Sequence, residues 1–217
     1  MTNAIEPCAV VTVPDPAQAA AWLEENLFFR RLAPDTVANG TCVLRLRQGL
    51  AQTAAAGAGQ YLTGPAHIAL RTADIDAAQK HCQSAGLQLS LEEGHSFFNP
   101  KVFGAGERYF NIAAPFGVTV EISQRVAAPH YGERMLIDGL DHIGLPCADL
   151  RRRMDALQSA GFAPEFEPVH NYNDREGNIH CCMLRRDGVT LEVYQFDDMT
   201  PVPMPDGAAL ALPGIPL

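Results

Sequence analysis

Two histidines and two glutamates recur at matching positions along the 217-residue chain. His142 follows His67 by 75 positions, and each histidine begins a short apolar segment. Glu121 and Glu192 each stand four residues after a glycine, within a later apolar segment. Two imidazoles and two carboxylates that face one another make a five- or six-coordinate site for a divalent metal such as Ni, Zn, Fe(II), Mn or Co. Their joint recurrence predicts metal chemistry.

The elements that carry these residues form an internal repeat. The apolar segment His67–Leu70 is followed by Asp74, a typical helix N-cap, and a helical spacing of apolar residues then runs to Gly86. The same pattern returns 75 positions later in His142–Leu145, Asp149 and Gly161. A repeat of this kind predicts two similar structural units.

Each copy continues into three extended segments that are typical of strands. They span residues 87–91, 108–113 and 118–122 in the first copy, and residues 162–169, 179–184 and 189–194 in the second. We therefore predict an α+β fold built from repeated βαβββ units. If the first and last strands of both units are neighbours in one curved sheet, the four polar side chains converge.

A third, degenerate copy precedes the other two. Cys8–Val13 has the pattern of a strand, and Asp15 is placed as a helix N-cap. Cys8 stands where the other copies have histidine, and Thr53 stands where they have glutamate. The predicted organisation is a degenerate unit over 1–60, βαβββ units over 61–128 and 129–196, and a proline-rich tail over 197–217.

The pattern resembles the vicinal oxygen chelate superfamily, which includes glyoxalase I, methylmalonyl-CoA epimerase, extradiol dioxygenases and bleomycin or fosfomycin resistance proteins. The residues that carry the resemblance are His67, Pro115-Phe116-Gly117-x-x-x-Glu121, His142 and Gly188-x-x-x-Glu192. It covers about residues 65–195. The resemblance implies an open, U-shaped mixed barrel, with His67, Glu121, His142 and Glu192 as the metal ligands.

Retention of a glutamate in both units resembles the glyoxalase I pattern. It implies a metal-dependent lyase or isomerase that acts on a small oxygenated substrate with Ni, Zn, Co or Mn, and in which Glu121 or Glu192 moves a proton. An extradiol dioxygenase is the alternative, with Fe(II) held by His67, His142 and Glu192. A metal-free binding protein of the bleomycin-resistance type is the third interpretation.

Two more histidines are candidate catalytic residues. His170 lies 28 residues after the second repeat histidine, as His95 lies 28 residues after the first. His180 precedes Glu192 by 12 residues, on a predicted strand. We predict that His170 or His180 contacts the substrate as an acid or base.

Composition limits the partners. The net charge of −9, from 16 basic and 25 acidic residues, argues against a nucleic-acid partner, which requires a basic face. The sequence shows neither a membrane-spanning segment nor the pattern of a signal peptide, so we expect no membrane partner and a cytoplasmic protein. The six cysteines lack a C-x-x-C pair and are expected to be reduced core residues. An odd number of units leaves one sheet edge unpaired, which favours a homodimer.

Overall fold

The computed structural model describes residues 8–51, 55–127, 135–173, 177–205 and 207–215, without the side chains of residues 171–173. Over this part of the chain the fold is mixed α+β, as predicted. Its helices are α1 (Pro16–Leu27), α2 (Ile75–Ser84) and α3 (Leu150–Ser159). None of these helices is long and apolar enough to span a membrane.

Each helix begins at an aspartate whose carboxylate accepts hydrogen bonds from backbone N–H groups of the first turn. Asp15 accepts from residues 17 and 18, Asp74 from residue 77, and Asp149 from residue 152. These contacts satisfy donors that an α-helix leaves unpaired at its start. The predicted N-caps are therefore confirmed in all three copies.

A five-stranded sheet forms the N-terminal part of the molecule. Its strands, in spatial order, are β17 (Leu210–Ala211), β1 (Ala9–Val13), β4 (Cys42–Gln48), β3 (Thr36–Asn39) and β2 (Arg30–Ala33). The predicted strand Cys8–Val13 is confirmed as β1 with one residue fewer. β17 comes from the tail and pairs with β1 from within the same chain. It therefore covers one edge of this sheet, next to β1, and the homodimer stays a prediction.

A larger, ten-stranded sheet carries both repeat units. The strands of its main path, in spatial order, are β12 (Ala163–Pro164), β14 (Gly177–Arg186), β15 (Val189–Phe196), β11 (Leu140–Pro146), β6 (His67–Arg71), β10 (Thr119–Arg125), β9 (Glu107–Ala113) and β7 (Leu89–Ser90). β13 (Val169–Asn173) pairs with β14, and β8 (Phe97–Asn99) pairs with β9. The two remaining strands, β5 (Gln60–Thr63) and β16 (Thr200–Pro203), pair with each other.

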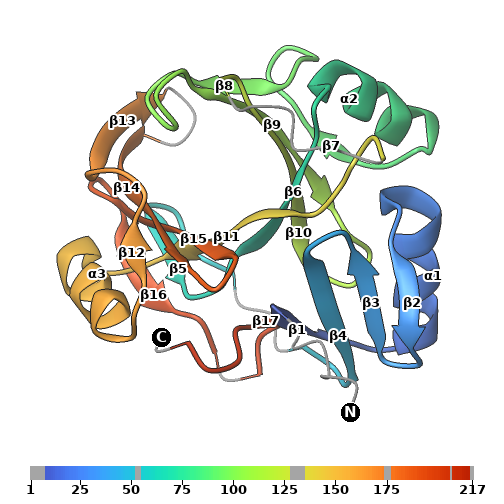
Figure 1. The fold of residues 1–217 in the computed structure, drawn as a ribbon. Coiled ribbons are helices and arrows are strands. Elements are labelled where there is room, and N and C mark those ends of the chain that lie inside the picture. Colours follow the sequence, from blue (N-terminus) through green and yellow to red (C-terminus); the bar gives the residue numbers. More distant parts are fainter. Residues whose placement is uncertain (1–7, 52–54, 128–134, 174–176, 206, 216–217) are drawn as a thin grey trace.

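The large sheet curves into an open barrel, with α2 and α3 outside it (Figure 1). At its centre, β6 and β11 pair antiparallel, while β10 joins β6 and β15 joins β11 in parallel. Each βαβββ unit thus contributes its first and last strands to the middle of one sheet. The expected neighbouring of these strands is confirmed.

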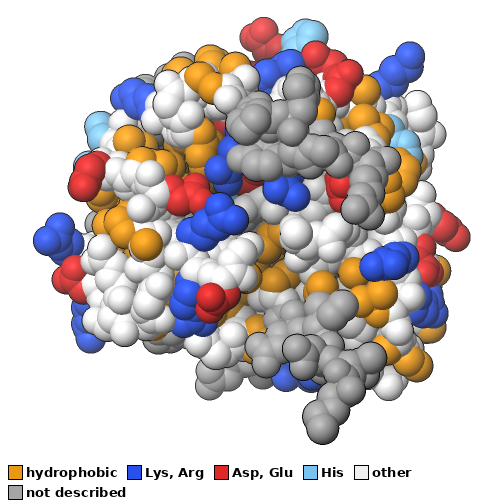
Figure 2. Space-filling model, in the orientation of Figure 1, with side chains coloured by type: hydrophobic (Ala, Val, Ile, Leu, Met, Phe, Trp, Pro, Cys, Tyr) orange, Lys and Arg blue, Asp and Glu red, His pale blue; other side chains and the backbone are white. Residues whose placement is uncertain are grey.

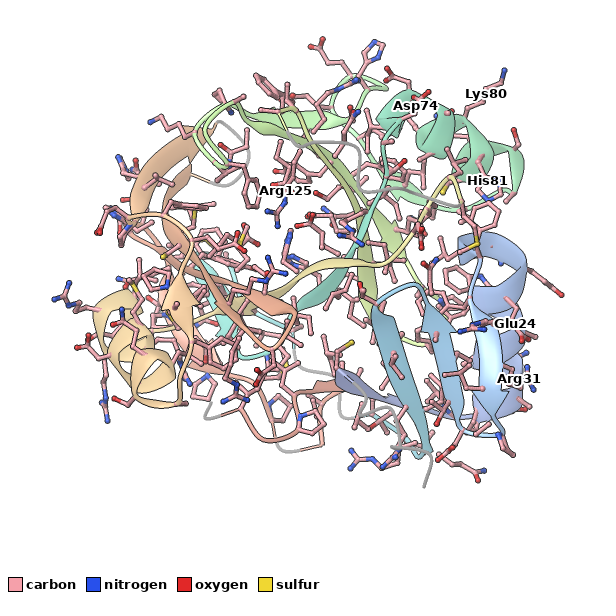
Figure 3. The ribbon with its side chains drawn as sticks, viewed as in Figure 1. Glu24, Arg31, Asp74, Lys80, His81 and Arg125 are labelled. Carbon is pink, nitrogen blue, oxygen red and sulfur yellow. The ribbon has the colours of Figure 1, made fainter. Side chains whose placement is uncertain are left out.

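Apolar faces at helical spacing fix the helices on the sheet. On α2 the buried residues are Ile75, Ala78 and Cys82, and on α3 they are Leu150, Met154 and Leu157. α2 also faces α1, as the position of His81 in Figure 3 shows: its Nε2 donates to the Asn26 carbonyl oxygen at 2.9 Å. All six cysteines are free and five of them are buried, as expected for reduced core residues.

Val102 and Phe103, which follow β8 in the first repeat unit, pack against residues of the second unit. They connect the two sides, or arms, of the open barrel. Val102 is fully buried and packs with Ile179 and Cys181 of β14. Phe103 makes an edge contact with Phe166, with ring centroids 5.8 Å apart. The predicted U shape is therefore closed on one side by side-chain packing in place of strand pairing.

Two expectations about strands need correction. The predicted strand 162–169 is divided into β12 and the start of β13, because its middle residues leave the ladder of β14. The predicted strand 87–91 is reduced to β7, which has two residues. The tail, for which no central strand was expected, contributes the short strands β16 and β17 at sheet edges, where proline is tolerated.

Candidate metal centre

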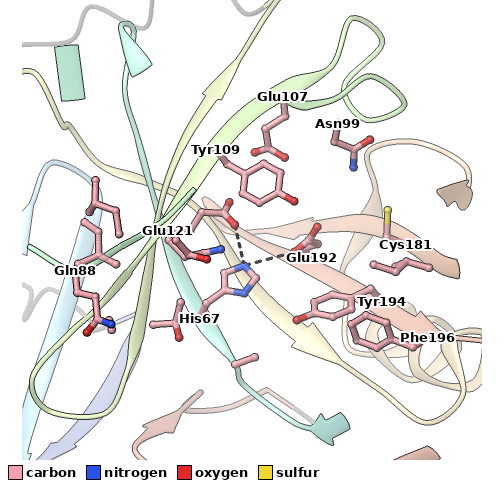
Figure 4. Close-up of a pocket in the computed structure, with 18 residues that line it drawn as sticks. His67, Gln88, Asn99, Glu107, Tyr109, Glu121, Cys181, Glu192, Tyr194 and Phe196 are labelled. Atoms are coloured by element: carbon pink, nitrogen blue, oxygen red, sulfur yellow. Dashed lines mark ion pairs between the residues drawn. The ribbon is translucent and has the colours of Figure 1, made fainter. Parts of the chain in front are cut away.

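Four polar side chains from the four central strands meet inside the barrel. They are His67 on β6, Glu121 on β10, His142 on β11 and Glu192 on β15. The two imidazole Nε2 atoms lie 3.2 Å apart. Figure 4 shows both carboxylates directed at His67, with Oε2 of Glu192 at 3.5 Å and Oε2 of Glu121 at 4.0 Å from its Nε2.

His142 has the same two carboxylate neighbours. Its Nε2 atom lies 3.4 Å from Oε1 of Glu121 and 3.6 Å from Oε2 of Glu192. A metal bonded to such ligands at about 2.1 Å holds them roughly 3 to 3.4 Å apart. The four side chains therefore fit a divalent ion with small adjustments, and the donor set of two nitrogens and two carboxylates suits one.

Small residues opposite each histidine make this convergence sterically possible. In the ladder between β6 and β11, His67 faces Gly144, and His142 faces Ala69. A Cβ atom added at Gly144 would collide with the imidazole ring of His67. Gly144 and Ala69 are equivalent positions of the repeat, each two residues after its own histidine. Each unit thus leaves space for the histidine of the other.

A chain of charged groups behind His142 orients its ring. Nδ1 of His142 donates to Oδ1 of Asp141 at 3.0 Å, which leaves Nε2 directed at the cluster. The register of β11 shifts between Leu140 and His142, which lets neighbouring side chains act on the same side of the strand. Arg125 in turn donates to Asp141 at 2.8 Å and lies inside the barrel in Figure 3.

The electrostatics of the cluster favour a cation. Burial and, to a smaller extent, the nearby His142 together lower the pKa of His67 to about 3. For His142 burial also acts to lower the pKa, but the hydrogen bond to Asp141 and the carboxylates of Glu192 and Glu121 outweigh it and raise the pKa to about 10. Burial raises the pKa of Glu121 well above its usual range. The field that stabilises a proton on His142 would equally stabilise a divalent ion among these carboxylates.

A further buried acid, Glu107, stands beside the cluster. It accepts a hydrogen bond from the hydroxyl of Ser123, and burial raises its pKa to about 7. Its carboxylate groups with Asp141 and His142 as a second set of close metal-ligand atoms. Sequence reasoning did not single out Glu107, Asp141 or Arg125. Asp141 has no acidic counterpart in the first copy, where Ala66 occupies the equivalent position.

The cluster opens onto a cavity of about 530 Å³. Amide and hydroxyl groups line it together with aromatic rings, and its charged lining residues are the three glutamates. The side chains labelled in Figure 4 include Gln88, Asn99, Tyr109, Tyr194 and Phe196. A small molecule in this cavity would meet both carboxylates of the cluster and several neutral hydrogen-bonding groups.

His170 and His180, the other predicted catalytic residues, are not brought to this cluster. Ile179 and Cys181, which flank His180 on β14, line the cavity, so strand alternation turns His180 to the opposite face. His170 is paired directly with His180 across the ladder. Both contact Asp197 instead. A catalytic role for either histidine stays a prediction.

Comparison with known proteins places the chain in a family. Residues 5–122 match the profile of the Glyoxalase/Bleomycin resistance protein/Dioxygenase superfamily, and the chain belongs to this superfamily. The match takes in the N-terminal copy, His67 and Glu121. Among proteins with curated descriptions, none matches the chain.

Solved structures show the same fold at low sequence identity. The structure of glyoxalase I from Zea mays has a TM-score of 0.61 at 18% identity, over 88% of this chain and 67% of that one. The protein from Bacillus subtilis subsp. subtilis str. 168 described as a "putative dioxygenase" has a TM-score of 0.52 at 17% identity, over 85% of this chain and 61% of that one. At this identity the likeness concerns the fold alone.

Proposed function

We propose that this protein is a metal-dependent lyase or isomerase that acts on a small oxygenated substrate. His67, Glu121, His142 and Glu192 would hold one divalent ion, of the class of Ni, Zn, Co or Mn. The observation that carries the proposal is that each carboxylate approaches both imidazoles, at 3.4–4.0 Å. These distances support the inclusion of both glutamates in one proposed ligand set.

The two carboxylates supply the acid–base chemistry. When bound, the metal would polarise a substrate oxygen and make the neighbouring C–H bond more acidic. Glu121 and Glu192 come from the outer strands of the four, so they flank the imidazole pair and both line the cavity. A carboxylate that swings toward the substrate can take a proton from one carbon and return it to the next. Glu192, with a side chain 19% exposed against 8% for Glu121, has the easier access.

The cavity lining supports the proposed substrate class. Tyr109, Asn111 and Asn99 offer hydrogen bonds to hydroxyl or carbonyl oxygens, and Tyr194 and Phe196 offer apolar surfaces. A compact α-hydroxy or α-keto compound, whose adjacent oxygens can reach a metal at the four ligands, matches these groups.

The extradiol dioxygenase uses only three of the four ligands. It would hold Fe(II) through His67, His142 and Glu192 and leave Glu121 without a role. Glu121 lies slightly closer to Nε2 of His142 than Glu192 does. The geometry therefore favours the reaction that employs both glutamates.

Metal content tests the proposal. We expect protein purified without chelators to hold one equivalent of a divalent metal that His67→Ala abolishes and that Glu121→Gln and Glu192→Gln weaken at least tenfold. Glu167→Gln, an exposed glutamate outside the cavity, should leave it unchanged. Retention of the metal in Glu121→Gln, with oxygen consumption on catechols, would favour the dioxygenase. If the purified protein holds no metal whose binding depends on His67, the proposal is overturned, and a binding protein becomes the favoured interpretation.

Activity is tested on the proton transfer itself. We expect metal-loaded protein to exchange the α-hydrogen of some small α-hydroxy or α-keto compounds with D2O under argon, as followed by NMR. Glu192→Gln should abolish the exchange even when metal is supplied in excess, since the carboxylate is the base. Exchange that survives in both glutamate variants would assign the proton to another group.

A further inference from the structure

A second cluster of metal-ligand groups lies on the outer side of the barrel wall. His170 on β13 and His180 on β14 are direct cross-strand partners, and Asp197 follows the end of β15. Nε2 of His180 lies 2.9 Å from Oδ2 of Asp197, and Nε2 of His170 lies 3.9 Å from the same oxygen. Two imidazole nitrogens from two strands thus lie within 3.9 Å of one carboxylate oxygen.

The backbone and a neighbouring amide fix this arrangement. The N–H of Asp197 donates to the carbonyl oxygen of Asn178 at 2.9 Å, which holds the carboxylate beside β14. The side-chain oxygen of Asn178 lies 3.1 Å from Nε2 of His170, and its amide nitrogen donates to Asp198 at 2.6 Å. The two imidazole rings lie side by side, with centroids 4.6 Å apart. The cluster is therefore oriented before any ligand arrives.

This cluster is separate from the central one. His180 is turned away from the cavity that Ile179 and Cys181 line on the same strand. The side chains of His170, His180 and Asp197 are 49%, 43% and 37% exposed, so water and ions reach them directly. The central histidines are 12% and 1% exposed. An ion at the outer cluster would not pass through the cavity.

We propose that His170, His180 and Asp197 form a second divalent-metal site, suited to an ion of the Zn²⁺ class. One ligand atom from each of the three residues lies within 4.8 Å of the other two. A tetrahedral zinc ion with bonds of about 2.0–2.1 Å separates its ligands by roughly 3.3 Å, so changes of up to about 1.5 Å in these separations complete the geometry. The exposure of all three side chains leaves the fourth position to water.

Such a site would join three segments of the barrel wall. Among the described strands, β13 pairs with β14 alone, whereas Asp197 belongs to the chain that leaves β15. An ion held by all three residues therefore ties β13 to the strand beyond its own partner. Metal binding at this site should stabilise the protein by mass action, as a ligand of the folded state does.

Zn²⁺ titration, by calorimetry and by thermal unfolding, tests the proposal. We expect a class of Zn²⁺ sites that survives His67→Ala and is weakened at least tenfold in the double variant His170→Gln/His180→Gln. The Zn²⁺-dependent rise in Tm that survives His67→Ala should also disappear when the two substitutions are added to that variant. The control is His95→Gln, an exposed histidine outside the cluster, which should bind as wild type does.

The outcomes separate this site from the central one. Unchanged Zn²⁺ binding in the double variant would overturn the proposal, and so would an equal loss in His95→Gln. Asp197→Asn should weaken the same class of sites, because it removes the charged ligand, and full retention of affinity would count against the assigned ligand set. Metal binding at the central site is judged from the effect of His67→Ala alone. Metal binding at the outer site is judged from the double variant, so one proposal can fail without the other.

Discussion

At the scale of single residues, Gly144 has a role that a larger residue cannot fill. Its missing side chain makes room for the imidazole of His67, the partner directly across the ladder. Gly144→Ala should displace this ring and weaken metal binding at least tenfold, while the backbone, which is not in the left-handed region at this position, stays intact. Competition against a chelator measures the affinity.

The matched control for that substitution is Gly49→Ala. There, among the described residues, an added Cβ would meet only the side-chain methyl of Thr12, at 3.1 Å, far from the candidate ligands. We expect unchanged metal affinity in this variant. Equal losses in the two variants would mean that the effect at Gly144 is general destabilisation.

Asp141 acts through His142. Its carboxylate holds Nδ1 of the imidazole and is itself paired with Arg125. Outer groups of this kind typically change metal affinity by about 10- to 100-fold. Asp141→Asn should therefore weaken metal binding within that range, since the amide keeps the shape but loses the charge. Asp155→Asn, on the exposed side of α3, is the control, and identical affinities in both variants would deny Asp141 this positioning role.

The four candidate ligands were predictable because they recur. Histidine and glutamate at matched repeat positions stand out against a strand pattern that is otherwise apolar. Asp141 was not predictable in this way, because it depends on a local register shift in β11 that has no counterpart at Ala66. Glu107 comes near the cluster through the pairing of β9 with β10, which places it opposite Arg125. Spacing along the chain does not encode such contacts.

At the scale of elements, the N-caps set where the helices begin. The carboxylate of Asp149 accepts from the N–H of Arg152 and opens α3, which packs behind β14 and β15. Asp149→Ala should reduce the free energy of unfolding by about 1 kcal/mol. Urea denaturation measures the change. Glu25→Ala, at an exposed position within α1, should be nearly neutral, and a similar loss there would show that the cap is not responsible.

The sequence predicted the positions of the helices more accurately than the ends of the strands. An aspartate cap, a spacing of three and four, and a terminal glycine are all local signals, and they located α2 and α3. The strands depend on partners far away in the chain. Residues 162–169 have the composition of one strand, yet β14 pairs only with parts of this segment. The short tail strands likewise exist because β1 and β5 offer free edges.

At the scale of the whole molecule, side-chain packing closes the barrel where hydrogen bonding does not. Val102 is fully buried between the arms, against Ile179 and Cys181. Val102→Ala removes two methyl groups from this contact and should cost about 2 kcal/mol of unfolding free energy. We also expect faster hydrogen exchange in β13 and β14, because the arm that Val102 holds becomes freer.

Val126 provides the control for this change. It is 51% exposed, so Val126→Ala should alter the unfolding free energy by less than about 0.5 kcal/mol. If Val102→Ala is as mild as this control, packing at the bridge does not hold the arms together.

The exterior of the molecule is mixed in charge. Acidic and basic side chains are interspersed around the rim of the face in Figure 2. Three acidic residues lie inside, where Glu107, Glu121 and Glu192 line one cavity. Some of the acidic residues of the sequence therefore lie in the interior of the protein.

The antiparallel pairing of β6 with β11 places a seam between the two repeats in the middle of the sheet. One histidine and one glutamate lie on each side of that seam, so neither repeat owns a full set of ligands. An ion held by all four side chains would connect the two repeat units. At a concentration one hundred times its Kd it would add about 2.7 kcal/mol to the stability of the joined state. Loss of either half would release the ion, so selection on metal binding acts on both copies together.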